Sequence, residues 1–264
     1  MKIFLPLLLA FQLVTGCTST RQFLGTTLIS TEDEIALGQK VAAQVEQQHR
    51  MHPDPALQRY VRNIALDLAR YSEADRPGIT YHIKVIDDPK QVNAFAVPGG
   101  YLYVYTGLLL AAANEAEVAG VMAHEIGHIV GRHSANQLAT QHGIDIFTTL
   151  ILGEDPAALG QIAAQFGTAG ALADFSRDDE LESDKFGVKY LIACGYDPRG
   201  LLSFFEKLKA MEGGRPSDLE AFFSTHPPTD ERIRRIERLV EKAGNPTGDK
   251  HQARFLRATA GLRR

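Results

Sequence analysis

The segment that most constrains this chain reads HEIGH and runs from His124 to His128. Residues four apart on an α-helix lie about 40° apart around its axis, so the two imidazole rings project from one face. The residues around them, from Ala119 to Val130, are otherwise apolar on every side, and such a helix is normally buried. Buried ionisable side chains usually have a partner or a metal ion. The segment therefore predicts a buried helix that presents two histidines to one zinc ion.

Glu125 follows the first histidine directly. In the motif H-E-x-x-H this glutamate acts as general base on a zinc-bound water and does not bind the metal. Asn114 with Glu117 three residues later resembles a helix N-terminus, which places the motif in mid-helix. The ordinary alternative is three polar side chains that make hydrogen bonds within a core. The order of the motif favours a zinc hydrolase, most simply a peptidase.

A catalytic zinc site needs a third protein ligand and an open position for water. A third histidine on the same run would have to stand at position 134, which is Ser134. His133 is one residue short, and on a continuous helix it would point away from His128. The remaining option is a carboxylate from a later helix.

The acidic segment 176–187 offers several carboxylates, and helical spacing divides them into rows. One row pairs Asp178 and Glu182 with two lysines, which is typical of a solvated face. The other row places Glu180 and Asp184 beside a glycine and a leucine, which suit close packing. We therefore expect Glu180 to be the third ligand, and Asp184 to accept the N–H of a ligand histidine and fix its tautomer. For the other acids we expect a solvated helix start stabilised by the helix dipole.

These residues resemble the minigluzincin metallopeptidases, which include the CAAX prenyl proteases and the bacterial heat-shock membrane protease. The resemblance rests first on the HEIGH motif together with Glu180 and Asp184, and it runs from about Thr31 to Val240. Since the chain lacks internal transmembrane spans, it is most similar to the soluble, lipid-anchored bacterial branch. Further segments that match the family are Asn93–Gly100, Tyr101–Leu109, Phe175–Arg177, Ser224–Pro227 and Arg232–Ile233.

The resemblance implies a zincin-like domain with a small sheet beside the zinc helix. It also implies that a peptide lies extended along an exposed sheet edge and makes main-chain hydrogen bonds. The substrate-binding residues at this edge would be Asn93, Ala94, Phe95 and Ala96.

His226 and Arg232 acquire their roles from the same resemblance. His226 would lie near the metal, where it either donates to the oxyanion or occupies the fourth zinc position and holds the enzyme latent. Without the resemblance, it reads as a surface histidine that caps the final helix. Arg232 would support a ligand or orient the substrate.

The amino terminus predicts export and lipidation. Lys2 precedes an apolar run from Ile3 to Val14, which is too short to span a bilayer comfortably and resembles a secretory signal. The run ends in a segment that resembles a lipobox, with Cys17 as the acylated residue; a plain signal peptide is the alternative. Thr18, in place of an aspartate, resembles the sorting rule for outer-membrane lipoproteins. We expect an outer-membrane lipoprotein that faces the periplasm, because acyl chains on Cys17 would anchor it in the membrane.

Composition and spacing complete the expectations. The net charge is −4 and no basic face emerges, so we expect no nucleic-acid partner. With Cys17 acylated, Cys194 has no second cysteine, which excludes a disulfide framework.

We predict an α+β, mainly helical fold, with residues 1–16 as signal peptide, 17–30 as tether, 31–245 as the peptidase domain and 246–264 as a solvated basic tail. The expected helices are 31–49, 54–71, the zinc helix, 136–175, the Glu180 helix, one after residue 198 and 229–243; the expected strands are 80–86 and a pair within 93–105.

The sequence thus predicts a zinc endopeptidase that cleaves unfolded or misassembled envelope proteins, with the outer-membrane assembly machinery as a candidate partner. The alternative is a chaperone-like binding module at the outer membrane, in which the zinc site is latent or mainly structural. Glu125 separates the two, because a structural site needs ligands but no base.

Overall fold

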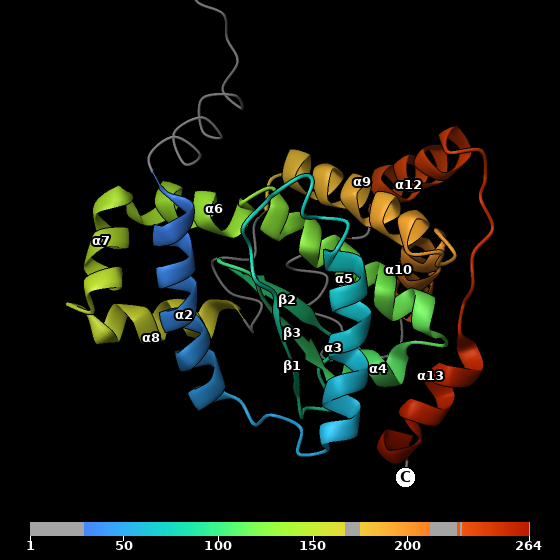
Figure 1. Ribbon diagram of the computed structural model, residues 1–264, viewed down its shortest axis with the longest axis horizontal. Helices are drawn as coiled ribbons and strands as arrows, with labels where there is room; N and C mark the ends of the chain where they lie inside the picture. Colours follow the sequence, from blue (N-terminus) through green and yellow to red (C-terminus); the bar gives the residue numbers. More distant parts are fainter. Residues whose placement is uncertain (1–28, 167–174, 212–225, 228, 264) are drawn as a thin grey trace, which may run out of the picture.

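The computed structural model describes residues 29–166, 175–211, 226–227 and 229–263. The expected signal peptide, Cys17 and most of the expected tether lie outside these residues, as do Ser224 and Thr225 of the late motif. Figure 1 shows a small sheet enclosed by helices, which confirms the predicted α+β, mainly helical class. In the described part of the chain, no helix combines the length and the apolar character needed to cross a bilayer.

The sheet has three strands: β1 (His82–Ile86), β2 (Ala94–Val97) and β3 (Tyr101–Tyr105), in the order β1-β3-β2. β1 is parallel to β3, and β2 is antiparallel to it, with Ala94 opposite Val104. The turn between β2 and β3 requires φ of 76° at Gly99 and 99° at Gly100, a region that L side chains avoid. Because β3 lies between the other two strands, β2 forms an edge of the sheet among the described residues.

The alternation of side chains along β3 creates two hydrophobic clusters, one on each face of the sheet. Leu102 and Val104 belong to the cluster formed with α3 (Pro55–Ala69) and α5 (Glu115–Val130). Tyr103 and Tyr105 belong to the cluster formed with α2 (Thr31–Gln48) and α8 (Pro156–Phe166). Figure 1 shows these two groups of helices on either side of the strands. The helices are α2 (Thr31–Gln48), α3 (Pro55–Ala69), α4 (Thr106–Ala111), α5 (Glu115–Val130), α6 (His133–His142), α7 (Ile144–Leu152), α8 (Pro156–Phe166), α9 (Arg177–Ala193), α10 (Gly200–Met211), α12 (Asp230–Lys242) and α13 (Gln252–Ala258), followed by the 3-10 turn η1 (Ala260–Arg263).

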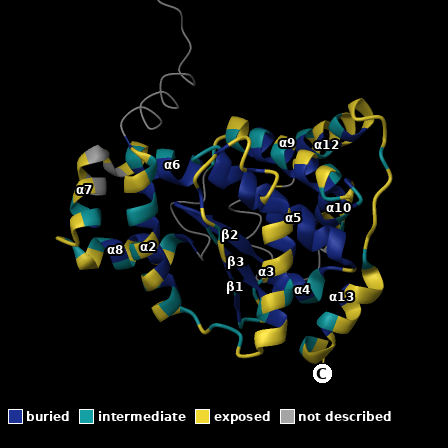
Figure 2. Ribbon diagram, in the orientation of Figure 1, coloured by how far each residue is buried: buried dark blue, intermediate teal, exposed yellow. Residues whose placement is uncertain are grey.

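The zinc helix α5 is buried along its whole length, as its apolar sequence predicted (Figure 2). The predicted start is confirmed, because the side chain of Asn114 accepts a hydrogen bond from the backbone N–H of Glu117. Helix α9 packs along α5, and the close approach depends on Gly127: a Cβ there would lie 2.8 Å from Cα of Ser183. This contact brings the acidic segment of α9 to the HEIGH motif.

The predicted helical stretch 136–175 is helical from residue 136 to Phe166, where it is divided into α6, α7 and α8; the breaks fall at Gly143, whose φ is 81°, and at Gly153, whose φ is 76°. One expectation about the fold was wrong. The basic tail is not frayed, because α13 buries Phe255 in the main cluster. Arg254 of the same helix pairs with the buried Glu115 at the start of α5. The buried aromatic ring, this ion pair and backbone hydrogen bonds from Glu115 and Ala116 to the carbonyl of Lys250 help to hold the tail on the domain.

Candidate active site

The two histidines of the motif lie where helical spacing placed them. Both rings are buried, and their Nε2 atoms lie 3.0 Å apart. Burial lowers the pKa of His128 well below its ordinary value, so its ring is neutral and keeps a lone pair. Two ring nitrogens that face each other at this distance need a proton or a cation between them.

Glu180 is the third member, as predicted from the rows of α9. Its Oε2 lies 3.4 Å from Nε2 of His124, and its Oε1 lies 3.4 Å from Nε2 of His128. Burial opposes the ionisation of Glu180, but the charge of Arg232 and the neighbouring histidines hold its pKa well below the ordinary value. The carboxylate is therefore ionised inside the protein, where a cation would be its natural counterpart.

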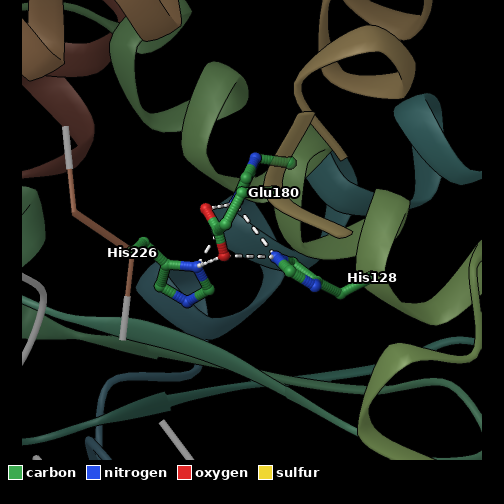
Figure 3. Close-up of side chains that lie close together, drawn as sticks. His128, Glu180 and His226 are labelled. Carbon is green, nitrogen blue, oxygen red and sulfur yellow. Dashed lines mark hydrogen bonds and ion pairs between the residues drawn. The ribbon is translucent and has the colours of Figure 1, made fainter. Parts of the chain in front are cut away.

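His226 completes a group of four potential metal ligands. Its Nδ1 lies 2.9 Å from Oε1 of Glu180 and 3.3 Å from Nε2 of His124. Figure 3 shows the carboxylate of Glu180 between the rings of His128 and His226. One ligand atom from each of the four residues lies within 4.8 Å of the others, and all four are buried. Imidazole nitrogens and a carboxylate oxygen, so clustered, fit a zinc ion.

Asp184 and Arg232 lie behind the ligands, one layer further out. Oδ1 of Asp184 is 3.0 Å from Nδ1 of His124, the contact predicted for fixing the tautomer of that ring. Arg232 donates to both oxygens of Asp184, from Nε at 2.8 Å and from Nη2 at 2.6 Å. Its Nη1 also lies 2.5 Å from Oε2 of Glu180. The geometry supports a ligand-supporting role for Arg232, while a substrate-orienting role stays a prediction.

Glu125 lies beside this group without being part of it. Its side chain is buried, and within the described part of the chain its Oε1 accepts no hydrogen bond, although Nε2 of His226 is 3.3 Å away. Burial raises the pKa of Glu125 to about 7. A carboxylate with a spare acceptor and a pKa near neutrality is suited to taking and returning a proton.

The predicted substrate edge lies directly over Glu125. The backbone N–H of Ala96 in β2 hydrogen-bonds the Glu125 carboxylate, and its carbonyl accepts from the Ser134 hydroxyl at 3.2 Å. Asn93, Ala94, Phe95 and Ala96 are all buried, and the N–H and carbonyl of Ala96 already have partners within the protein. The structure thus brings the edge to the site; its binding of substrate stays a prediction.

His133 is the residue that sequence reasoning assigned wrongly. It was expected to point away from His128 on a continuous helix, but α5 ends at Val130 and Arg132 adopts a left-handed φ of 59°. The break turns the ring back, so that Nδ1 of His133 lies 3.0 Å from Nδ1 of His128. Glu182, expected on a solvated face, lies 3.2 Å from the other ring nitrogen of His133. The glycine at position 131, which interrupts the apolar run, was the available signal.

Comparisons with known proteins agree with this geometry. A family model described as peptidase family M48 matches residues 55–240. The mitochondrial metalloendopeptidase OMA1 of Schizosaccharomyces pombe is 34% identical over 165 residues, which cover 62% of this chain and 48% of that protein. The beta-barrel assembly-enhancing protease of Escherichia coli K12 is 28% identical over 220 residues, which cover 79% of this chain and 44% of that protein.

A shorter relative, the metalloprotease YcaL of Escherichia coli K12, is 33% identical over 161 residues, which cover 60% of this chain and 61% of that protein. The chain spans about half the length of the first two relatives and 61% of this one. The HEIGH motif and Glu180 both fall within the residues that the family model matches.

Proposed function

This chain belongs to peptidase family M48, a family of metalloproteases, and we propose that it is a zinc-dependent endopeptidase that cleaves unfolded or misassembled proteins of the bacterial envelope. The observation on which the proposal depends is the position of Glu125. A buried carboxylate with a raised pKa, one oxygen of which accepts no hydrogen bond in the described part of the chain, stands next to, but outside, a group of potential metal ligands.

The zinc ion would be held by His124, His128 and Glu180, the three residues that the motif spacing predicted. When bound, zinc would acidify water and polarise a peptide carbonyl. Glu125 takes a proton from the attacking water and delivers it to the leaving amine nitrogen. The main chain of β2 aligns the peptide through strand addition, which accepts varied side chains. Such tolerance suits substrates recognised by their lack of structure.

The second proposal concerns His226, which we assign to a latent state. Its Nδ1 lies with the other three ligand atoms, at the place where an active zinc site keeps an open position. Its Nε2 faces Glu125 at 3.3 Å, so the ring stands between the base and the ligands. In this position the ring excludes water and substrate. The alternative role, donation to the oxyanion, requires the ring to move away from Glu180.

The location and substrates rest on the amino terminus and on the names of relatives. The signal, the lipidation at Cys17 and the outer-membrane location are proposed from residues 1–18. One relative is named a beta-barrel assembly-enhancing protease. By analogy, misassembled outer-membrane proteins and their assembly machinery are the proposed substrates and partner of this chain.

A chaperone-like module with a mainly structural zinc site remains the second candidate. Four ligands close together favour it, because structural zinc sites are fully coordinated by protein. The presence of Glu125 favours the peptidase, because a structural site needs no base with an open acceptor.

Substitution of Glu125→Gln tests the proposal. The variant should keep zinc and the fold, since Glu125 is not a ligand, while cleavage of an unstructured model protein falls at least about 100-fold. Glu237→Gln, the same change on an exposed residue of α12, should cleave like the wild type. Undiminished cleavage by Glu125→Gln would refute the assignment. The inactive variant, expressed with its anchor, would then trap clients in the envelope for identification.

A further inference from the structure

We infer that His133 is a positioning residue for the metal ligand His128: it accepts the Nδ1–H of that ring and is itself oriented by acidic side chains of α9. The inference rests on the proposed zinc site and adds a residue to it. The two Nδ1 atoms are 3.0 Å apart, and His133 is buried.

The seat of the His133 ring is built by its neighbours along the chain. A Cβ at position 131 would lie 2.2 Å from Nε2 of His133, so the ring occupies the space that Gly131 leaves open. The left-handed φ of Arg132 then turns the chain between α5 and α6. The ring is thus placed by a glycine and a helix break, features that a solvated histidine would not need.

The protons on the two rings can be assigned from their partners. Nε2 of His128 faces His124 and Glu180, so it must keep its lone pair for a metal, and the proton of the neutral ring is on Nδ1. The Nδ1–H of His128 donates to Nδ1 of His133. Nδ1 of His133 is therefore unprotonated, and the proton of the His133 ring is on Nε2. That Nε2 has carboxylate oxygens as acceptors: Glu182 at 3.2 Å and Asp179 at 3.5 Å.

A hydroxyl completes the surroundings of the ring. Oγ of Ser183 is 3.3 Å from Nδ1 of His133. Because a hydroxyl can donate or accept, this contact is compatible with the assigned tautomer, which is fixed by His128 and by the two carboxylates of α9.

The arrangement parallels that of the other ligand ring. Nδ1 of His124 is oriented directly by Asp184 of α9, whereas Nδ1 of His128, further along α5, is linked to Glu182 and Asp179 of α9 through His133. Helix α9 thus supplies one ligand, Glu180, and orients the other two. Partners of this kind are worth about 10- to 100-fold in metal affinity.

The test compares zinc affinities by chelator competition in wild type, His133→Phe and His133→Asn. Phenylalanine keeps a planar ring but has no acceptor, so the zinc dissociation constant should rise about 10- to 100-fold. Asparagine can place its carbonyl oxygen near the position of Nδ1, and it should recover most of that loss. His82→Phe, the same change on an exposed residue of β1, should leave the affinity unchanged.

Nitrogen-15 NMR of the zinc-loaded wild type provides a second measurement that needs no variant. We expect His133 to be protonated on Nε2 and to have an unprotonated Nδ1. A proton on Nδ1 of His133, or a His133→Phe variant that binds zinc like the wild type, would overturn the inference. Failure of the wild type itself to bind zinc would instead refute the proposed function.

Discussion

Arg232 binds Asp184 through two parallel hydrogen bonds, Nε to Oδ2 at 2.8 Å and Nη2 to Oδ1 at 2.6 Å, with both side chains buried. The same carboxylate contacts Nδ1 of His124 at 3.0 Å. The remaining nitrogen of the guanidinium lies 2.5 Å from Glu180. One cation from α12 therefore keeps two carboxylates of α9 ionised and in place, one that orients a ligand ring and one that would bind the metal.

This relationship predicts the effect of Arg232→Lys. An ammonium group cannot contact both oxygens of Asp184 and reach Glu180 at once, so zinc affinity should fall about 10-fold or more. The free energy of unfolding should fall by about 2–4 kcal/mol, because the buried carboxylates lose part of their compensation. Arg235→Lys, an exposed position on the same helix, should change neither quantity. Unchanged zinc affinity in Arg232→Lys would refute the ligand-supporting role and limit Arg232 to stabilising the fold through its ion pairs and its packing over the ring of Phe205.

The clustering of the three candidate ligands and the mainly helical class could be predicted because they depend on local periodicity. His124 and His128 share a helix face whatever the rest of the chain does. Glu180 and Asp184 were separated from their acidic neighbours because only their row continues into residues suited to packing, and both are buried in the structure. The family resemblance supplied His226 and Arg232, whose contacts across 102 and 108 residues of chain to His124 no local pattern encodes.

Removal of the His226 ring tests the proposed latent state. If Nδ1 of His226 holds the position that water requires, His226→Ala should cleave an unstructured protein severalfold faster, because more molecules are in the competent state. The measurement is the initial rate at saturating zinc, with His82→Ala as an exposed control. A lower rate would contradict the latent state and favour donation to the oxyanion.

What could not be predicted depends on a backbone break and on distant contacts. The assignment of His133 assumed a continuous helix, and the left-handed residue Arg132 invalidated that assumption. The tail after residue 245 reads as basic and polar, so nothing local indicated that Phe255 would be buried. The tail is also held by the pair of Arg254 with Glu115, which lies 139 residues earlier in the chain.

Replacing either of two glycines at the α5–α9 interface by alanine should change the free energy of unfolding in opposite directions. Gly127→Ala places a Cβ 2.8 Å from Cα of Ser183, a backbone contact that forces the helices apart, and should cost about 1–3 kcal/mol. Because Glu180 lies one turn from Ser183 on α9, zinc affinity should fall as well. Gly187→Ala meets only an ordinary contact, 3.5 Å from the backbone N of His124, and should gain up to about 1 kcal/mol from helix propensity.

Urea unfolding and chelator competition on the two variants measure both effects. Similar stabilities for Gly127→Ala and Gly187→Ala would show that the separation of α5 and α9 does not depend on the glycine at position 127.

The pairing of the C-terminal helix with the start of α5 predicts how stability depends on pH. Burial by itself would raise the pKa of Glu115, but hydrogen bonds from Arg254, Tyr60 and Tyr196 outweigh burial and hold the pKa below its ordinary value of 4.5. The two hydroxyls donate at 2.6 and 2.7 Å, and Nε of Arg254 donates at 2.7 Å. The folded state therefore favours the ionised carboxylate.

The sign follows from the lowered pKa. The stabilisation from Glu115 is fully present above about pH 4.5, where the carboxyl is ionised in both states, and it is lost as the pH falls through the folded-state value. Glu115→Gln should lower the free energy of unfolding at pH 7 by about 1–2 kcal/mol: two tyrosine hydroxyls and Arg254 lose their ionised acceptor, but Arg254 is half exposed and water compensates part of its charge. Below pH 4.5 the stability of the variant should decline less steeply than that of the wild type, since one titrating group is gone. Urea titrations from pH 7 to pH 3 measure how the free energy of unfolding of wild type and Glu115→Gln declines with pH, with Glu237→Gln as the exposed control. Parallel declines for wild type and Glu115→Gln would show that Glu115 and its three donors do not set the acid sensitivity of the domain.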